Sequence, residues 1–201
     1  GLVGCKTSGD IVVEQGVGIT AVRSICPAVG IAEHTGDVTL FSPAGATTAD
    51  ALDVTAVITN VRSTCDDTGT EVRSDATFEV QALRRNTQGA RTVELTYFGT
   101  VLRGGDAVIA KRLRTVTLNF ADGQARASAP GMAGALVNRA EATLPADIRE
   151  RITREREAGD NDAAVDPLTL PEVRAALARA NFELLVGFQL TDAQLQYNAT
   201  R

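Results

Sequence analysis

The sequence predicts a mainly β fold, a two-sheet antiparallel sandwich with a helical insertion near the C-terminus. Several segments alternate apolar and polar residues with a period of two, as half-buried strands do. Glycine-containing turns separate these segments, and a helical pattern appears only late in the chain. This order of elements favours one packed β structure that a helical segment interrupts.

Two segments alternate most regularly, residues 76–83 and residues 93–101. They are rich in β-branched and aromatic residues, which suit a pleated surface. The polar stretch between them, residues 86–90, has the composition of a turn. We therefore expect the two strands to pair with each other as an antiparallel hairpin.

A third long strand is predicted over residues 107–120, after the turn formed by Gly104-Gly105-Asp106. It would complete a three-stranded meander. Leu113 lies on the opposite phase from Val116 within this segment. We expect a β-bulge within residues 111–115, which would bring both side chains to one face.

Shorter strands are predicted over residues 37–41, 52–58 and 139–144. Taken together, the strands resemble in pattern the two-sheet sandwiches of immunoglobulin and fibronectin domains. The chain has no Trp, so the core signature of antibody domains is missing. The resemblance therefore implies an architecture and no function.

After Leu144 the periodicity becomes helical, and we expect a helical insertion over about residues 145–181. Its first helix, residues 145–157, carries few apolar residues and is expected to lie solvated on the surface. Its second helix begins at Pro171 and places Val173 and Leu177 on one face.

Residues 182–190 are strongly apolar and alternate again, so we expect them to return into the sandwich as a core strand. This return makes residues 11–201 a single domain, with residues 1–10 as a separate N-terminal segment. Thr191 and Gln194 have capping-box spacing, which predicts a short final helix.

Composition and charge argue against several partners. The 201 residues carry a net charge of -5, whereas nucleic-acid binding depends on clustered Lys and Arg. Only 4% of the residues are aromatic, which leaves few platforms for base stacking. No apolar stretch approaches the about 18 residues of a membrane span. We expect no nucleic-acid partner.

The N-terminal segment contains Leu2-Val3-Gly4-Cys5. These residues resemble the lipobox of bacterial envelope lipoproteins, in which an aliphatic and a small residue precede a cysteine that is acylated. The resemblance implies that residues 2–4 end a signal peptide, that Cys5 anchors the protein to a membrane, and that residues 6–10 form a tether. Because Lys6 rather than Asp follows the cysteine, it implies the outer membrane, with the folded domain in the periplasm. An ordinary unpaired cysteine is the alternative.

Cys26 and Cys65 remain as a pair once Cys5 is assigned to lipid. In an oxidising compartment such a pair closes into a disulfide, which would stabilise the fold by about 4 kcal/mol. Two buried free thiols are the alternative. Zinc is disfavoured because the chain has no Cys-x-x-Cys spacing and one histidine, His34.

One stretch of the acidic chain is locally basic. Residues 76–128 contain eight basic and four acidic residues, a balance of +4. The candidate basic surface consists of Arg84, Arg85, Arg91, Arg103, Lys111, Arg112 and Arg114, with Arg126 nearby. Such a surface suits anionic lipid headgroups or an acidic partner. The alternative is the solvated outer face of a sheet.

Residues for catalysis are scarce. The single histidine argues against triads and multi-histidine metal sites. Asp160-Asn161-Asp162 lacks the glycine and closing glutamate of an EF-hand loop, so we expect a solvated loop there. We expect no catalytic residue, no metal and no cofactor.

The expected function is that of a non-catalytic, membrane-anchored envelope lipoprotein, a structural or adaptor module with an envelope protein as partner. The alternative is a lipoprotein that binds a small or lipid-like ligand, which requires an apolar pocket. A third hypothesis, a hydrolase, requires Asp or Glu residues with raised pKa values gathered in a cleft.

Overall fold

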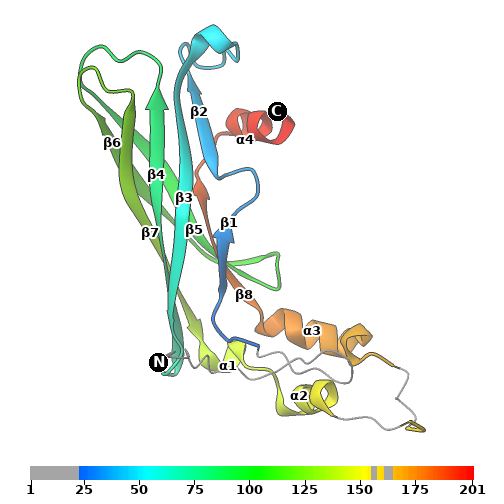
Figure 1. Cartoon of the computed structure of the whole chain (residues 1–201). Helices are drawn as coiled ribbons and strands as arrows, with labels where there is room; N and C mark the ends of the chain where they lie inside the picture. The colour runs from blue at the N-terminus through cyan, green and yellow to red at the C-terminus, as the bar shows by residue number, and fades with distance from the viewer. Residues whose placement is uncertain (1–22, 155–157, 161–164) are drawn as a thin grey trace.

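The computed structural model describes residues 23–154, 158–160 and 165–201, and it is mainly β, with two four-stranded sheets (Figure 1). The first sheet has the order β1 (Ala28–Ile31), β8 (Phe182–Phe188), β5 (Arg91–Arg103) and β6 (Ala107–Phe120). The second sheet has the order β2 (Asp37–Phe41), β3 (Leu52–Asp66), β4 (Glu71–Arg84) and β7 (Arg126–Asn138). The predicted two-sheet, mainly β architecture is confirmed.

The helices lie around the two sheets. They are α1 (Arg139–Ala142), α2 (Ala146–Thr153), α3 (Pro171–Ala180) and α4 (Asp192–Thr200), with short 3-10 turns at Ala49–Ala51 and Pro167–Thr169. In Figure 1, α1, α2 and α3 gather below the sheets, whereas α4 lies beside β2. Within the described residues no helix is long and apolar enough to cross a membrane.

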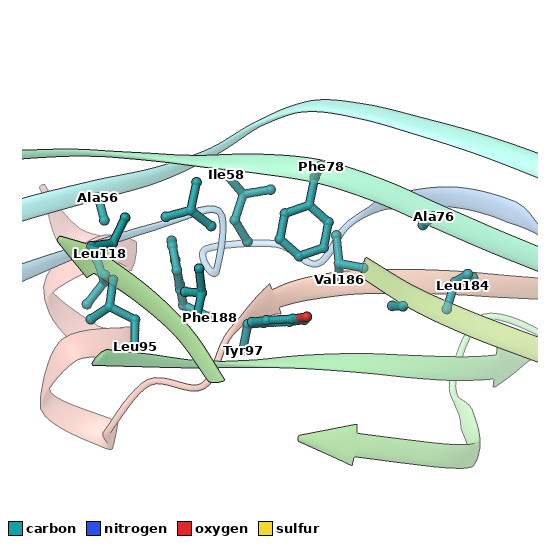
Figure 2. Close-up of a cluster of buried hydrophobic side chains, with 14 of the residues drawn as sticks. Ala56, Ile58, Ala76, Phe78, Leu95, Tyr97, Leu118, Leu184, Val186 and Phe188 are labelled. Atoms are coloured by element: carbon teal, nitrogen blue, oxygen red, sulfur yellow. The ribbon is translucent and has the colours of Figure 1, made fainter. Parts of the chain in front are cut away.

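The core lies between the two sheets, as Figure 2 shows. Ile58 of β3 and Phe78 of β4 face the side chains of β5 and β8. Phe78 and Tyr97 meet edge to face, with ring centroids 5.1 Å apart, a favourable aromatic geometry. The Tyr97 hydroxyl donates to the Met132 carbonyl (3.0 Å) and accepts from its N–H (3.2 Å), so this buried polar group is paired.

Strand β8 is the core strand that the sequence predicts. Its inward side chains are buried: Phe182, Leu184, Val186 and Phe188. Its main chain is bonded on both sides, since Phe188 N donates to Thr35 O (2.8 Å) and Gln189 N donates to Thr96 O (2.9 Å). The pairing of β8 with β1 is parallel, so the prediction of purely antiparallel sheets is wrong for this one pair.

The predicted hairpin between residues 76–83 and 93–101 is wrong. β4 pairs with β3 and β7, whereas β5 pairs with β6 and β8. Residues 86–90 do turn, because Asn86 Oδ1 accepts from Gln88 N (3.0 Å) and Gly89 adopts a φ of 76°. The turn carries the chain from one sheet to the other, since both edges of β4 are occupied.

The predicted strand over residues 139–144 is also wrong. Residues 139–142 form α1, which Asn138 caps by accepting a hydrogen bond from Ala140 N (2.9 Å). The strand that precedes it, β7, escapes prediction because its inward residues are small. A Cβ at Gly131 would overlap the Phe78 ring, so the space that a larger apolar residue would fill is already occupied.

The β-bulge in β6 lies outside the predicted residues 111–115. The register shifts where Val101 pairs with Ala110 and Leu102 pairs with Val108, which leaves Ile109 as the extra residue. Leu113 needs no bulge because it points out of the core and is 58% exposed. Val116 lies on the opposite, buried face.

The helical segment has a small core of its own. Ile148 and Ile152 of α2 are buried against α3, which contributes Val173 and Ala176. The prediction of a fully solvated first helix is therefore wrong: these two residues, four apart, form a narrow apolar stripe. The capping box of α4 is confirmed, with Thr191 as its N-cap.

Two contacts tie β3 of the second sheet to the first sheet. Near its end, Cys65 forms the predicted disulfide with Cys26, which precedes β1, and their Cα atoms are 6.2 Å apart. At its start, Asp53 accepts two hydrogen bonds from Arg91 of β5, at 2.7 and 2.8 Å. These hydrogen bonds hold the pKa of Asp53 below its ordinary value.

Because β8 lies in the core and Leu113 of β6 lies on the surface, the same substitution of a leucine should change the free energy of unfolding by different amounts in the two strands. Leu184→Ala should lower the free energy of unfolding by about 2 to 5 kcal/mol, because Leu184 is fully buried and its truncation leaves a cavity. Leu113→Ala should change it by less than about 0.5 kcal/mol. Urea denaturation measures both, and equal effects would contradict the placement of β8 in the core.

Asp53→Asn should destabilise the fold by about 1 kcal/mol at neutral pH, since the paired carboxylate is only partly exposed. Because the folded pKa lies below the unfolded value of about 3.8, this contribution is present above the unfolded pKa. It disappears as the pH falls through the folded pKa.

Denaturation of wild type and D53N across this pH range provides the measurement. Asp106→Asn, on the exposed β5–β6 turn, is the matched control and should have little effect at any pH. A gap between wild type and D53N that stays constant well below pH 3.8 would count against the ion pair.

Candidate interaction surface

The predicted basic residues do not form one continuous surface. Arg84 is only 2% exposed. Its guanidinium donates to the carbonyls of Gln124 (2.8 Å), Ala121 (2.9 Å) and Thr87 (3.0 Å), and lies 5.1 Å from the centre of the Phe120 ring. Its inclusion in a basic surface is wrong, because turns at this end of the molecule present carbonyls that require a buried donor.

Three further arginines hold neighbouring elements in place. Arg85 donates to the carbonyl of Ala49, and Arg91 pairs with Asp53 as described above. Arg103 donates through Nε to Arg179 O at the end of α3 (2.5 Å), and its guanidinium lies 5.3 Å from the centre of the Phe182 ring. A cation near the last carbonyls of a helix is favourable. Their charges are therefore partly used within the fold.

The remaining predicted residues lie together on one strand, β6. We call Lys111, Arg112 and Arg114 the β6 basic strip. All three are exposed, and within the described part of the chain none forms an ion pair. Lys111 lies over the Phe98 ring, with Nζ 4.9 Å from the ring centre, a cation–π contact that leaves the ammonium open to solvent.

The β6 basic strip presents different chemistry on its two faces. Lys111 pairs with Thr100 and shares the outer face of the first sheet with Leu113. Arg112 pairs with Gly99, and Arg114 pairs with Tyr97, so both point to the inner face. Exposed apolar residues accompany the strip, Val108 at 62%, Ile109 at 56% and Leu113 at 58%. The strand therefore combines positive charge with apolar area.

The hollows found on the described surface are open grooves. One, of about 550 Å³, lies on the second sheet and includes Val57, Leu83 and Arg126 in its lining. Another, of about 660 Å³, lies beside α1 and includes Asn138 and Thr143. The space between the sheets is occupied by side chains (Figure 2). Neither groove has the enclosed apolar lining that a lipid-like ligand requires.

Four acidic residues of the described chain have a pKa below its ordinary value, each because of a hydrogen bond to its carboxylate. Hydrogen bonds from Thr48, Arg91, Thr68 and Arg151 lower the pKa values of Asp50, Asp53, Asp66 and Glu172, respectively. Residues 23–154, 158–160 and 165–201 contain no group of three or more His, Cys, Asp or Glu side chains placed to hold a metal. Asn161 and Asp162 of the acidic loop lie outside the described residues.

Other predicted site residues have mixed outcomes. Cys5 lies outside the described residues, as do residues 1–10 as a whole. His34 lies in the turn between β1 and β2 with a left-handed φ of 63°, and its carbonyl accepts a hydrogen bond from Asn198 (2.8 Å). That contact attaches the turn to α4.

Strand order separates the β6 basic strip from the other arginines. β6 occupies one edge of the first sheet, and no further strand of the described chain pairs with its outer side. Charge in the sequence indicates these residues, but the predicted meander does not indicate that their strand lies at an edge. The exposed Leu113, out of phase with the core residues, was the available signal of an open strand.

Comparison of the chain with protein-family models, with curated proteins and with solved structures finds no match.

Proposed function

We propose that this protein is a non-catalytic envelope lipoprotein, anchored in the outer membrane through Cys5, whose folded domain acts in the periplasm as a structural or adaptor module. The observation that carries the proposal is the lipobox-like segment Leu2-Val3-Gly4-Cys5. In this proposal, residues 6–10 are a polar tether, and residues 11–201 are a single domain.

The Cys26–Cys65 disulfide supports an extracytoplasmic location. Cytosolic thiols are kept reduced, whereas disulfides persist in the periplasm and outside the cell. The bridge is compatible with an exported protein, in which Cys26 and Cys65 pair while Cys5 receives lipid. It therefore agrees with the export that the lipobox-like segment implies.

The two-layer architecture supports a module that positions other groups. Two packed sheets give a rigid body, in the general manner of immunoglobulin-like and fibronectin-like domains. An exposed strand edge, such as that of β6, is a common attachment point between proteins. An adaptor needs these two features, a rigid body and an accessible edge, and needs no catalytic centre.

The anchor is tested by expressing the complete gene, with its natural leader, in a bacterium and labelling the cells with radioactive palmitate. Cys5→Ala should abolish the label on this protein and move it from the membrane fraction to the soluble fraction, because no other residue of the pattern can take the thioether-linked lipid. Fractionation and autoradiography provide the measurement.

The matched control is the double variant Cys26→Ala and Cys65→Ala, which also loses cysteines but keeps the anchor. It should retain both the palmitate label and the membrane location. Membrane retention of the Cys5→Ala protein at the wild-type level, or label that persists on it, would refute the anchor.

A further inference from the structure

We propose that the open edge of β6 binds an extended acidic segment of a partner protein, which adds to the first sheet as a further strand. The proposal specifies the partner class of the adaptor role and rests on that role. It is independent of the lipid on Cys5.

Among the residues that the structure describes, no strand pairs with the outer side of β6. Along an antiparallel strand, the main-chain N–H and C=O groups of one residue point to the strand on one side, and those of the next residue point to the other side. Gln189 N donates to Thr96 O, so Thr96 bonds to β8, and the next residue, Tyr97, bonds to β6 at Arg114. By the same alternation, the N–H and C=O groups of Lys111, Leu113 and Thr115 point away from the sheet.

The other edge on this side of the molecule, β7, is obstructed near its centre. Pro130 has no N–H to donate, which suits the outer side of an edge strand. Both main-chain groups of Met132 are occupied by the Tyr97 hydroxyl. β6 has no equivalent protection from Ala110 to Thr115, a length of about 20 Å. Of these two edges, β6 therefore offers a partner strand the longer run of unobstructed main chain.

The side chains of β6 define the chemistry of that partner. A strand placed beside β6 would face Arg112 and Arg114 on the inner side, where acidic residues would form charge-assisted pairs. On the outer side it would face Leu113, where apolar residues would be favoured. The fitting sequence therefore alternates acidic and apolar residues.

A second copy of this chain fits the edge poorly. If two β6 strands paired antiparallel with Leu113 opposite Leu113 of the copy, Arg112 would lie opposite Arg114 of the copy. If the register were shifted by one residue, Arg112 would lie opposite Arg112 of the copy. Like charges directly opposite each other are destabilising. The positive charges of the β6 basic strip therefore disfavour pairing with a second copy, and they favour pairing with an acidic strand.

The test measures binding of a fluorescein-labelled synthetic peptide in which Glu alternates with Val. The full chain carrying Cys5→Ala is the protein in every arm, so that lipid does not interfere. We expect fluorescence anisotropy to show saturable binding of this peptide. A peptide with Lys in place of every Glu should bind at least about tenfold more weakly, because it repels the β6 basic strip.

Two kinds of variant locate the site. The triple variant Lys111→Glu, Arg112→Glu and Arg114→Glu should weaken binding of the acidic peptide at least about tenfold and favour the Lys peptide. Arg126→Glu reverses one basic residue on the second sheet in the same way and should leave binding within about twofold of wild type. Leu113→Pro removes an outward N–H without removing a β5–β6 hydrogen bond, and should abolish binding.

If a β6 variant fails to fold, amide hydrogen exchange on the protein with an unaltered β6 edge still tests the proposal. Bound peptide should slow exchange at Lys111, Leu113 and Thr115. Absence of peptide binding, binding that survives the triple charge reversal in folded protein, or protection confined to other strands would overturn the proposal. Dimers that dissociate in the triple variant, without peptide binding, would identify a second copy as the occupant. None of these results alters the palmitate outcome at Cys5.

Discussion

The rest of the fold depends on the insertion of β8 between β1 and β5. Its inward side chains complete the core, and its main chain pairs with β1 on one side and with β5 on the other. The pairing continues just beyond the strand ends, where Ala32 N donates to Val186 O and Gln189 N donates to Thr96 O. Because β8 occupies one side of β5, β6 occupies the other and becomes the outer strand. The same insertion therefore stabilises the core and leaves the β6 edge open, with the disulfide tying β3 to the segment before β1.

Much of this fold could be predicted because burial on one face imposes a period of two. The strand predicted over residues 182–190, observed as β8 (Phe182–Phe188), and the long strand β6 (Ala107–Phe120) follow from that constraint. β7 does not, because its inward positions hold small residues such as Gly131, which accommodate the Phe78 ring. The pairing of β4 also escaped prediction, since a turn at residues 86–90 determines that the chain reverses and does not determine which strand lies beside it.

The candidate site shows a similar division. Clustered charge in the sequence correctly drew attention to Lys111, Arg112 and Arg114, but it also included Arg84, which is buried under turn carbonyls. Charge alone cannot distinguish an arginine that satisfies main-chain groups from one that faces a partner. Strand order is needed to separate these two kinds of arginine. Among the described residues, β6 has main-chain groups without a partner strand because it lies at the edge of the first sheet.

Residue-resolved amide hydrogen exchange by NMR on the free protein tests both the insertion of β8 and the open edge directly. We expect slow exchange throughout β8 and an alternating pattern in β6, with Arg112 and Arg114 protected and Lys111, Leu113 and Thr115 fast. Fast exchange in β8 would contradict its place between β1 and β5. Uniformly slow exchange from Ala110 to Thr115 would show that the edge is already covered and would contradict its role as a docking strand.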